Sequence, residues 1–543
     1  MRASPSVTLA VLFAFASSIA LAAKPEDPKL DLPPAGILPA TITLADLLEK
    51  HDRAVGKLLP GVKNTAHEAW TFTDSGVGGT MTLLRSGTDY HSTIVSGPFT
   101  TQYGQQNNRR WQQDENGQTT DSQDTEERSF YMSRVLEDAS DPKNDAKILG
   151  EVGAPVPAYV VEVKVSGAKH PEWIFYDKST FLIDRVEAVT PGKRRLISTY
   201  SDYRATQGIT RPWNIGDTDG RTYFDDVYQR ASLTIGNPIP GKEFAAPPDK
   251  RTLTSISTPL WLPSKNVGNY TVLRVMINGR GLDFELVAGS SEIAIDSEIA
   301  RQLSLPTYGQ LTSTPDGRDR SYLTTVGDMS IGDMHLKDVT LDAIPITYHL
   351  DNETKVVGRL GFDFLKNLVL KVDYVNKTVE AFPPEHYDGS KEELTYALPI
   401  RIDGGLPFIS STVGSATSDR FIFDNSFPFT ILFGGFTQAH PDDVVDLGKH
   451  TAEILPVSSD SEIGHSYEIG VTSISRFSFG PTNYGSFPIM STTIPLNING
   501  ENIDGIVGKQ FIQFYDVTYD YPHKRIWLKP NKWFFKIFAP NKP

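Results

Sequence analysis

Two turns of this chain have matching flanking sequence, but only one of them carries a group that could do acid–base chemistry. The strand-like residues 284–286 lead into Val287-Ala288-Gly289, and 137 positions later residues 421–423 lead into Asp424-Asn425-Ser426. A carboxylate held at the end of a strand can accept or donate a proton. Asp-Asn-Ser is also favourable turn chemistry, so Asp424 alone predicts a turn as readily as a catalyst.

A glycine-led segment follows each of these turns. The segments are Gly361-Phe362-Asp363-Phe364-Leu365 and Gly508-Lys509-Gln510-Phe511-Ile512. Each is followed at a constant offset of 147 positions by Asp-Tyr, then lysine, then proline: Asp373-Tyr374, Lys377 and Pro383, against Asp520-Tyr521, Lys524 and Pro530. Identities at one fixed offset indicate an internal duplication of roughly 130 residues.

This order of turn, glycine segment and Asp-Tyr hairpin resembles the bacterial retropepsin-like aspartic proteases over about residues 265–535. The resemblance implies two β lobes, each of which contributes one Asp to a shared dyad. Val287 stands at the position of the first Asp, and Asp424 stands at the second. Two carboxylates that share one proton have pKa values that are pushed apart, which divides the acid and base roles between them. Valine can take neither role.

The positions beside the expected dyad also depart from the family's Asp-Thr-Gly pattern. The family's Thr, whose hydroxyl braces the two loops, is Ala288 in one copy and Asn425 in the other. The Gly is kept as Gly289 but is Ser426 in the second copy, where a tight turn would favour a residue without a Cβ. These changes favour an abandoned catalytic site. Glu285 remains an alternative carboxylate, because it lies two residues before Val287 and shares its face of an extended strand.

Composition and charge narrow the remaining function classes. The 543 residues are 39% hydrophobic and 22% charged, which is typical of globular proteins. A net charge of −14 disfavours nucleic acid as a partner, since phosphate binding needs basic patches. The chain contains no cysteine, and it lacks both a zinc-type HExxH and a serine-hydrolase GxSxG pattern. We therefore expect no cofactor and no metal site.

The first 22 residues predict a secretory signal peptide. Arg2 supplies a positive charge, residues 7–19 are mostly apolar, and Ala20-Leu21-Ala22 matches a cleavage site. The apolar run is too short to span a bilayer. Without cysteine there is neither a lipidation site nor a disulfide framework, so a periplasmic or secreted bacterial protein is predicted.

The fold class predicted is mainly β, with two retropepsin- or pepsin-like lobes in tandem behind an antiparallel β-sheet (α+β) domain. Short alternating strands fill residues 70–246, and an amphipathic helix is expected over residues 43–58. Residues 173–204 resemble the lipoprotein-carrier-like domains of bacterial envelope proteins. The expected segments are a signal peptide (1–22), a flexible lead-in (23–40), the carrier-like domain (41–246), a Pro-rich linker (247–264), lobe one (265–390) and lobe two (391–543).

Three functional hypotheses follow. The preferred one is a non-catalytic pseudo-peptidase that binds extended peptide or unfolded protein in an interlobe cleft, beneath hairpin tips at residues 313–319 and 457–464. The second is an active aspartic-type endopeptidase formed when two chains bring their Asp424 lobes together. The third is an envelope carrier whose N-terminal domain binds lipid or lipoprotein. The sequence does not predict the oligomeric state.

Overall fold

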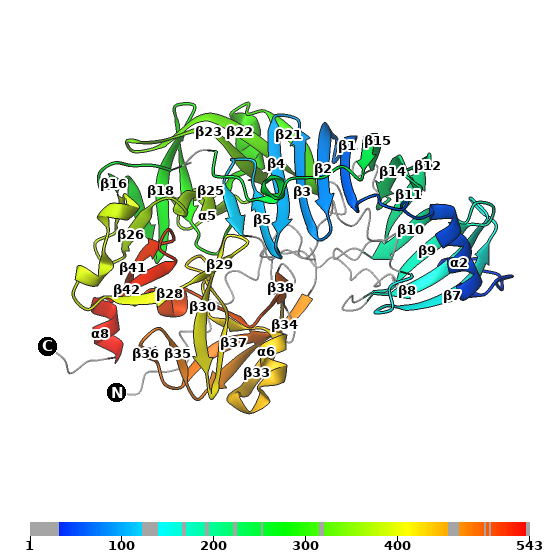
Figure 1. Cartoon of the computed structure of the whole chain (residues 1–543). Helices are drawn as coiled ribbons and strands as arrows, with labels where there is room; N and C mark the ends of the chain where they lie inside the picture. The colour runs from blue at the N-terminus through cyan, green and yellow to red at the C-terminus, as the bar shows by residue number, and fades with distance from the viewer. Residues whose placement is uncertain are drawn as a thin grey trace.

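Strands dominate the structure, a computed structural model that describes residues 32–121, 139–165, 170–189, 195–220, 225–250, 254–313, 320–453, 466–492, 496–498 and 501–538 (Figure 1). The signal peptide expected at residues 1–22 and the hairpin tips at 314–319 and 457–464 lie outside these ranges. Within them, no helix is long and apolar enough to cross a membrane.

The N-terminal part is one antiparallel sheet of 13 strands in the order β6-β5-β4-β3-β2-β1-β15-β14-β11-β10-β9-β8-β7. Its strands are β1 (Thr65–Asp74), β2 (Val77–Ser86), β3 (Asp89–Ser96), β4 (Phe99–Gln106), β5 (Arg109–Gln113), β6 (Thr119–Asp121), β7 (Asp145–Val152), β8 (Ala158–Lys164), β9 (Glu172–Asp177), β10 (Ile183–Val189), β11 (Arg195–Ser201), β14 (Asn214–Thr218) and β15 (Asp226–Ile235). A separate hairpin pairs β12 (Arg204–Thr206) with β13 (Ile209–Arg211).

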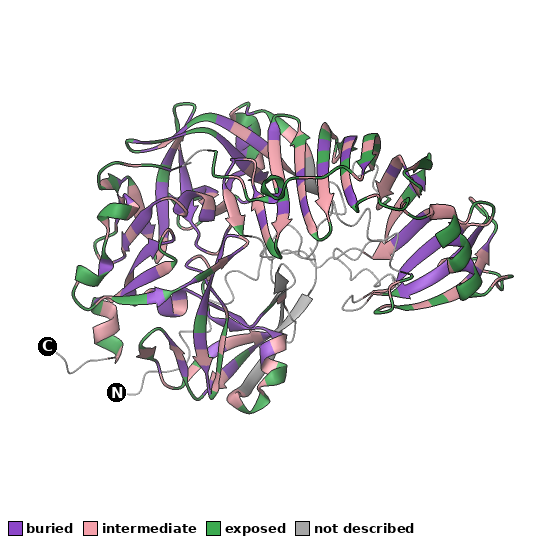
Figure 2. Ribbon diagram, in the orientation of Figure 1, coloured by how far each residue is buried: buried purple, intermediate pink, exposed green. Residues whose placement is uncertain are grey.

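Strands β8 and β9 lie in the region predicted to hold short alternating strands, but they are covered on both faces and so are buried almost continuously (Figure 2). Val161 and Ile174 belong to a core cluster on one side of the sheet. Val160 and Phe175, their neighbours along each strand, belong to a second cluster. Because successive side chains of a strand point to opposite faces, the two clusters lie on the two sides of the sheet.

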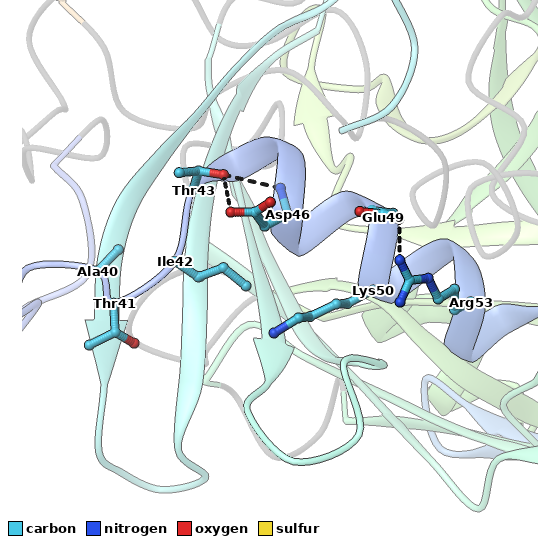
Figure 3. A pocket seen from close by; sticks show the side chains of 8 residues that line it. All are labelled: Ala40, Thr41, Ile42, Thr43, Asp46, Glu49, Lys50 and Arg53. Carbon is cyan, nitrogen blue, oxygen red and sulfur yellow. Dashed lines mark hydrogen bonds and ion pairs between the residues drawn. The ribbon is translucent and has the colours of Figure 1, made fainter.

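Helix α2 (Leu44–Val55) covers the first of these faces and places Leu47 in its core. The hydroxyl of Thr43 accepts a hydrogen bond from the amide of Asp46 and so caps the helix, as Figure 3 shows. The helix ends three residues before the predicted Leu58, because Gly56 turns the chain with a φ of 74° and leaves the helical region.

Lobe one is built on a nine-stranded mixed sheet. Its strands are β17 (Ser264–Val267), β18 (Tyr270–Ile277), β19 (Arg280–Leu286), β20 (Ile293–Asp296), β21 (Thr307–Ser313), β22 (Arg320–Ile331), β23 (Met334–Ile344), β24 (Tyr348–His349) and β25 (Lys355–Leu360). Helices α4 (Ser297–Gln302) and α5 (Phe362–Leu365) follow β20 and β25. Strand β19 pairs with β25 in parallel, which brings the Val287 turn beside the glycine segment that starts at Gly361.

Lobe two is a ten-stranded sheet with the same central arrangement. Its strands are β29 (Arg401–Asp403), β30 (Leu406–Val413), β31 (Ala416–Phe423), β32 (Ile431–Leu432), β33 (Val444–Glu453), β34 (Ser466–Ile474), β35 (Phe477–Phe479), β36 (Thr482–Asn483), β37 (Phe487–Thr492) and β40 (Gly505–Val507), with a hairpin of β38 (Leu496–Ile498) and β39 (Glu501–Ile503) beside it. Its helices are α6 (Gly434–Ala439) and α7 (Lys509–Ile512). Strands β31 and β40 pair in parallel, as β19 and β25 do.

A six-stranded sheet joins the lobes in the order β16-β27-β26-β41-β42-β28. Its strands are β16 (Leu260–Leu262), β26 (Val369–Asp373), β27 (Thr378–Phe382), β28 (Tyr396–Pro399), β41 (Tyr515–Asp520) and β42 (Arg525–Pro530), and α8 (Lys532–Phe538) follows it. At the centre of this sheet, Lys371 of β26 pairs with Thr518 of β41. Thr518 is also the residue that aligns with Lys371 when the two halves are compared at the offset of 147 positions. Both hairpin lysines, Lys377 and Lys524, have positive φ angles of 61° and 53°. A local two-fold axis therefore passes between Lys371 and Thr518, and the predicted mainly β fold is confirmed.

Residues beside and within the predicted Pro-rich linker (247–264) contact both of its neighbours. Phe244 is buried and its carbonyl accepts a hydrogen bond from the Trp111 indole. Lys250 donates through its amide to Gly117, and the Thr254 hydroxyl donates to the Phe364 carbonyl in lobe one. These contacts connect the predicted linker to the N-terminal sheet and to lobe one.

The N-terminal sheet also contacts lobe one directly, and Figure 1 shows its first strands beside β21. The rings of Phe99 and Tyr308 meet edge to face at 5.1 Å. The buried side chain of Asn116 pairs with both backbone groups of Thr340, at 2.9 Å to the amide and 3.2 Å to the carbonyl. These contacts fix the sheet against the lobe.

Candidate functional site

The two turns singled out in the sequence are held by the same backbone hydrogen bonds. The amide of Val287 donates to the Leu360 carbonyl, and the amide of Asp424 donates to the Val507 carbonyl, both over 3.0 Å. The amide that follows each glycine then donates back to the turn: Phe362 to Ser290 and Lys509 to Phe427, both over 2.8 Å. The parallel strand pairs described above create this geometry, because each places the end of one strand beside the next segment.

The glycines that open the two segments, Gly361 and Gly508, pack directly against these turns. A Cβ on Gly361 would overlap the carbonyl oxygens of Ser290 and Glu292, and a Cβ on Gly508 would overlap those of Phe427 and Phe429. Neither glycine has a positive φ. Close backbone approach, rather than conformational freedom, therefore requires glycine at both positions.

The two turns meet at the centre of the molecule, so the structure brings the predicted site residues together. A Cβ on Gly289 would overlap the carboxylate of Asp424, which lies against the glycine backbone. Val287, Ala288, Asp424 and Asn425 are all buried. The hydroxyl of Tyr521, from the Asp-Tyr pair after β41, donates to the Ala288 carbonyl over 3.2 Å.

The loop brace that we expected to be lost is present, but an amide supplies it. The Asn425 side chain accepts a hydrogen bond from the Ala288 amide at 2.7 Å and donates one to the Leu286 carbonyl at 2.9 Å. A carboxamide has a donor and an acceptor on separate atoms, so one Asn can bind both backbone groups of the opposite turn. Absence of threonine therefore did not mean absence of the brace.

Asp424 is satisfied within its own turn. Its Oδ1 accepts hydrogen bonds from the Ser426 amide at 2.8 Å and from the Ser426 hydroxyl at 2.7 Å. Ser426 has no positive φ, so this turn does not need the glycine that the family pattern carries there. Among the described residues, no hydrogen bond joins Asp424 to a second carboxylate. The arrangement is that of a turn-capping Asp.

Glu285 is buried near this centre, but it is engaged by groups that the sequence did not single out. Its Oε1 lies 3.7 Å from Nζ of Lys509, and its Oε2 accepts a hydrogen bond from the Tyr348 hydroxyl. The Lys509 ammonium also lies over the ring of Tyr270. In the aligned segments Lys509 occupies the position of Phe362 in lobe one. A charged residue at an otherwise apolar position was the sequence feature that could have pointed to Lys509.

Burial governs the protonation of this pair. Removal from water raises the pKa of Glu285 to about 7, although the charges of Lys509 and Arg359 oppose the shift. The same desolvation lowers the pKa of Lys509 to about 7, against the attraction of Glu285 and Asp424. The Asp424 charge contributes to the raised pKa of Glu285. Glu285 is thus electrostatically coupled to Asp424, but a cation compensates it.

The residues described by the structure contain no group of three or more His, Cys, Asp or Glu side chains that could hold a metal ion. What the site offers chemically is one carboxylate bonded to a serine, a buried ion pair, and two turns braced by an amide.

Comparison with known families finds one match. A family model described as Aspartyl protease matches residues 273–364, a stretch that includes the Val287 turn and ends in α5. A comparison with curated proteins finds no match.

Several solved structures are similar at low scores. An aspartic proteinase from Irpex lacteus has 14% identity and a TM-score of 0.31, and the match covers 52% of this chain and 100% of that one. A LolA superfamily protein from Nitrosomonas europaea has 14% identity and a TM-score of 0.28, and the match covers 38% of this chain and 98% of that one. The strand topology, rather than these scores, defines the fold. By sequence, residues 273–364 of lobe one are similar to the aspartyl protease family.

Proposed function

We propose that this protein is an exported pseudo-peptidase, which binds extended peptide or unfolded protein between its two lobes without cleaving it. The observation that carries the proposal is the environment of Asp424. Its carboxylate is bonded to Ser426 and packed on Gly289, in a turn whose counterpart carries Val287.

Hydrolysis of a peptide by this fold needs two carboxylates that share a proton, because one must activate water while the other protonates the scissile carbonyl. Val287 can do neither. Glu285 is the nearest alternative suggested by the sequence, but its Oε2 is bonded to Tyr348 and its charge is paired with Lys509 at 3.7 Å. Both facts support a site that has kept its fold and lost its reaction.

Peptide binding is supported by apolar surface next to the turn. Phe429 lies five residues after Asp424, its carbonyl packs on Gly508, and its side chain is 38% exposed. An exposed aromatic side chain beside the centre can pack against apolar side chains of an extended segment. Strand addition, in which backbone hydrogen bonds give affinity and side-chain pockets give selectivity, is the binding mode that suits such a ligand.

The same proposal includes the organisation of the chain. We infer that lobe one and lobe two are copies of one unit, since the hydrogen bonds of the two turns recur at the sequence offsets noted above. The segments at 1–22, 41–246, 247–264, 265–390 and 391–543 remain our proposed division, and residues 1–22 support export to the periplasm or outside the cell.

A binding assay with fluorescein-labelled casein, an unfolded protein, tests the proposal. We expect saturable fluorescence anisotropy that is retained by Asp424→Asn, because the carboxylate is not needed for binding. Phe429→Ser should weaken binding. Trp261→Ser, at an exposed aromatic on β16, serves as the matched control and should leave binding unchanged. No binding by the unmodified protein would contradict the proposal.

A cleavage assay on the same casein separates the pseudo-enzyme from an active homodimer. Mass spectrometry at acidic and neutral pH should detect no products from the unmodified protein, and little from Val287→Asp, since Asp424 is already bonded to Ser426. If the unmodified protein cleaves casein and Asp424→Ala abolishes the cleavage, the pseudo-enzyme hypothesis is wrong. That result would favour a peptidase assembled from two Asp424 lobes.

A further inference from the structure

A small cavity in the N-terminal sheet, far in sequence from the Asp424 centre, has an unusual lining. It measures about 100 Å³ and is lined by residues of strands β1, β2, β14 and β15 of the sheet and of β13. A water molecule takes about 30 Å³ in the liquid, so the cavity has room for about three waters or one small oxyanion. Its walls combine apolar side chains with arginines.

Strand alternation places the lining residues on one face. On β1, Glu68 and Trp70 are two positions apart, and on β2, Leu83 and Arg85 are likewise two apart. Arg85 lies opposite Ala66 in the register of the two strands. The pairing of β15 with β1 shifts register between Ala69 and Trp70 of β1, so that Arg230 of β15 lies opposite Trp70. A β-bulge re-aims side chains, so it brings Arg230 to the face that Leu233 and Ile235 also line.

The described residues that line the cavity include three arginines, Arg85, Arg211 and Arg230, and one carboxylate, Glu68. Burial lowers the pKa of Arg230; the ion pair with Glu68 opposes this shift, and the positive charges of Arg211 and Arg85 add to it. Three guanidinium groups thus gather at one cavity, and guanidinium groups suit carboxylate and phosphate oxygens.

Arg230 is held in a fixed position at this cavity. Its Nη2 lies 3.1 Å from Glu68 Oε2, its Nη1 donates to the Pro212 carbonyl at 2.6 Å, and its guanidinium lies 4.3 Å from the Trp70 ring centroid. Its side chain is 7% exposed, and its buried Nε has no partner among the described residues. The Trp70 indole also donates to Glu68 Oε2, so that oxygen is shared between two donors. A pre-positioned guanidinium with an unused donor suits a carboxylate or phosphate oxygen.

We propose that this cavity is a binding site for an oxyanion, a carboxylate or phosphate group held by Arg85, Arg211 and Arg230. The apolar walls formed by Met81, Leu83 and Ile215 lower the local dielectric constant and so strengthen the attraction. The group could belong to a free anion or to the head of an acyl-chain ligand, and the two sources share this chemistry. The site does not depend on the proposed role of the Asp424 centre.

Inorganic phosphate is the first probe, used with the full chain. Because a ligand that binds only the folded state raises its stability, the melting temperature should rise with phosphate concentration and exceed that in sodium chloride of equal ionic strength. Arg85→Gln and Arg211→Gln should each weaken phosphate binding by about ten-fold or more, since a charged hydrogen bond is lost. Arg109→Gln, at an exposed arginine that pairs with Asp121, should leave the affinity unchanged.

Glu68→Gln keeps a hydrogen-bond acceptor for Arg230 but removes the negative charge of Glu68 from the lining, so it should tighten phosphate binding. Opposite effects of Glu68→Gln and Arg85→Gln on affinity are not expected if the cluster merely stabilises the fold. Dodecyl phosphate and dodecanol distinguish the sources: tighter binding of dodecyl phosphate than of inorganic phosphate identifies a lipid head group, and equal binding identifies a free anion. The proposal is overturned if phosphate acts no differently from chloride, if Glu68→Gln does not tighten binding, or if dodecanol binds as well as dodecyl phosphate.

Discussion

At the end of β19 the amide of Val287 donates to Leu360, and at the end of β31 the amide of Asp424 donates to Val507, with the same 3.0 Å separation. The side chains at these two turns differ completely: lobe one presents valine, alanine and glycine, whereas lobe two presents aspartate, asparagine and serine. Lobe two also carries the buried Lys509 where lobe one has Phe362. The comparison teaches that backbone packing maintains this fold, while its side chains are free to lose or change chemistry.

The largest effect should come from the glycines that the lobes share. Gly508→Ala and Gly361→Ala each place a methyl group inside turn backbone, and we expect each to lower the free energy of unfolding by about 3 kcal/mol. Thermal or urea denaturation measures the change. The matched control is Gly435→Ala in α6, where a Cβ meets nothing within 4 Å and the variant should gain about 0.5–1 kcal/mol. Similar stability of all three variants would break the proposed equivalence of the lobes.

The next effect concerns the brace that lobe two alone supplies. Asn425→Ala leaves the Ala288 amide and the Leu286 carbonyl buried without partners, which should cost about 2 kcal/mol of unfolding free energy. Asn483→Ala removes an asparagine hydrogen bond at an exposed turn, to the Gly485 amide, and should cost less than about 1 kcal/mol. Equal losses in the two variants would show that the amide does not hold the turns together.

The smallest effect on stability, and the most sensitive to pH, is expected at Glu285 and Lys509. Between its ordinary pKa of 4.5 and about 7, Glu285 keeps a proton in the folded state that the unfolded chain has released. Its contribution to stability is therefore lost as pH rises through 7. Lys509 releases a proton on folding between about 7 and 10.5, so its contribution is lost as pH falls from 10.5 through 7. The pair is least favourable near pH 7.

The double variant Glu285→Gln/Lys509→Met removes both titrations. Near pH 7 the free energy of unfolding of the double variant should exceed that of the unmodified protein by about 1 kcal/mol. This difference should shrink toward acidic and alkaline pH. Urea denaturation across this range measures the difference curve. Lys509→Met alone should be less stable than the double variant at pH 7, because it leaves the Glu285 carboxyl without its cation. A difference that does not vary with pH would exclude the pair as the cause.

Local patterns predicted much of the fold. The amphipathic helix expected over residues 43–58 matches α2, and the short strands expected within residues 70–246 include β8 and β9. The resemblance to aspartic proteases is confirmed over residues 273–364. These features could be predicted from the sequence because helix capping and strand alternation act between residues that are close in sequence.

Sequence reasoning failed where a residue's role depends on a distant partner. Phe244, just before the predicted Pro-rich linker, is buried, and its carbonyl accepts a hydrogen bond from Trp111, which is distant in the sequence. Asn425 was interpreted as a lost brace, because its two partners lie in a turn 137 residues away. The arginine cavity was not found, since its three arginines come from strands separated along the chain and Arg230 reaches it through a register shift.

By itself, the sequence determined that two turns have matching flanking residues, that a glycine-led segment follows each, and that Val287 leaves one turn without a carboxylate. Only the tertiary structure decided how those turns are joined: through an amide brace, with Asp424 bonded to Ser426 and Glu285 compensated by Lys509. The physical reason is that residue type and spacing set local geometry, whereas hydrogen bonds and ion pairs across the two-fold axis depend on the register of paired strands.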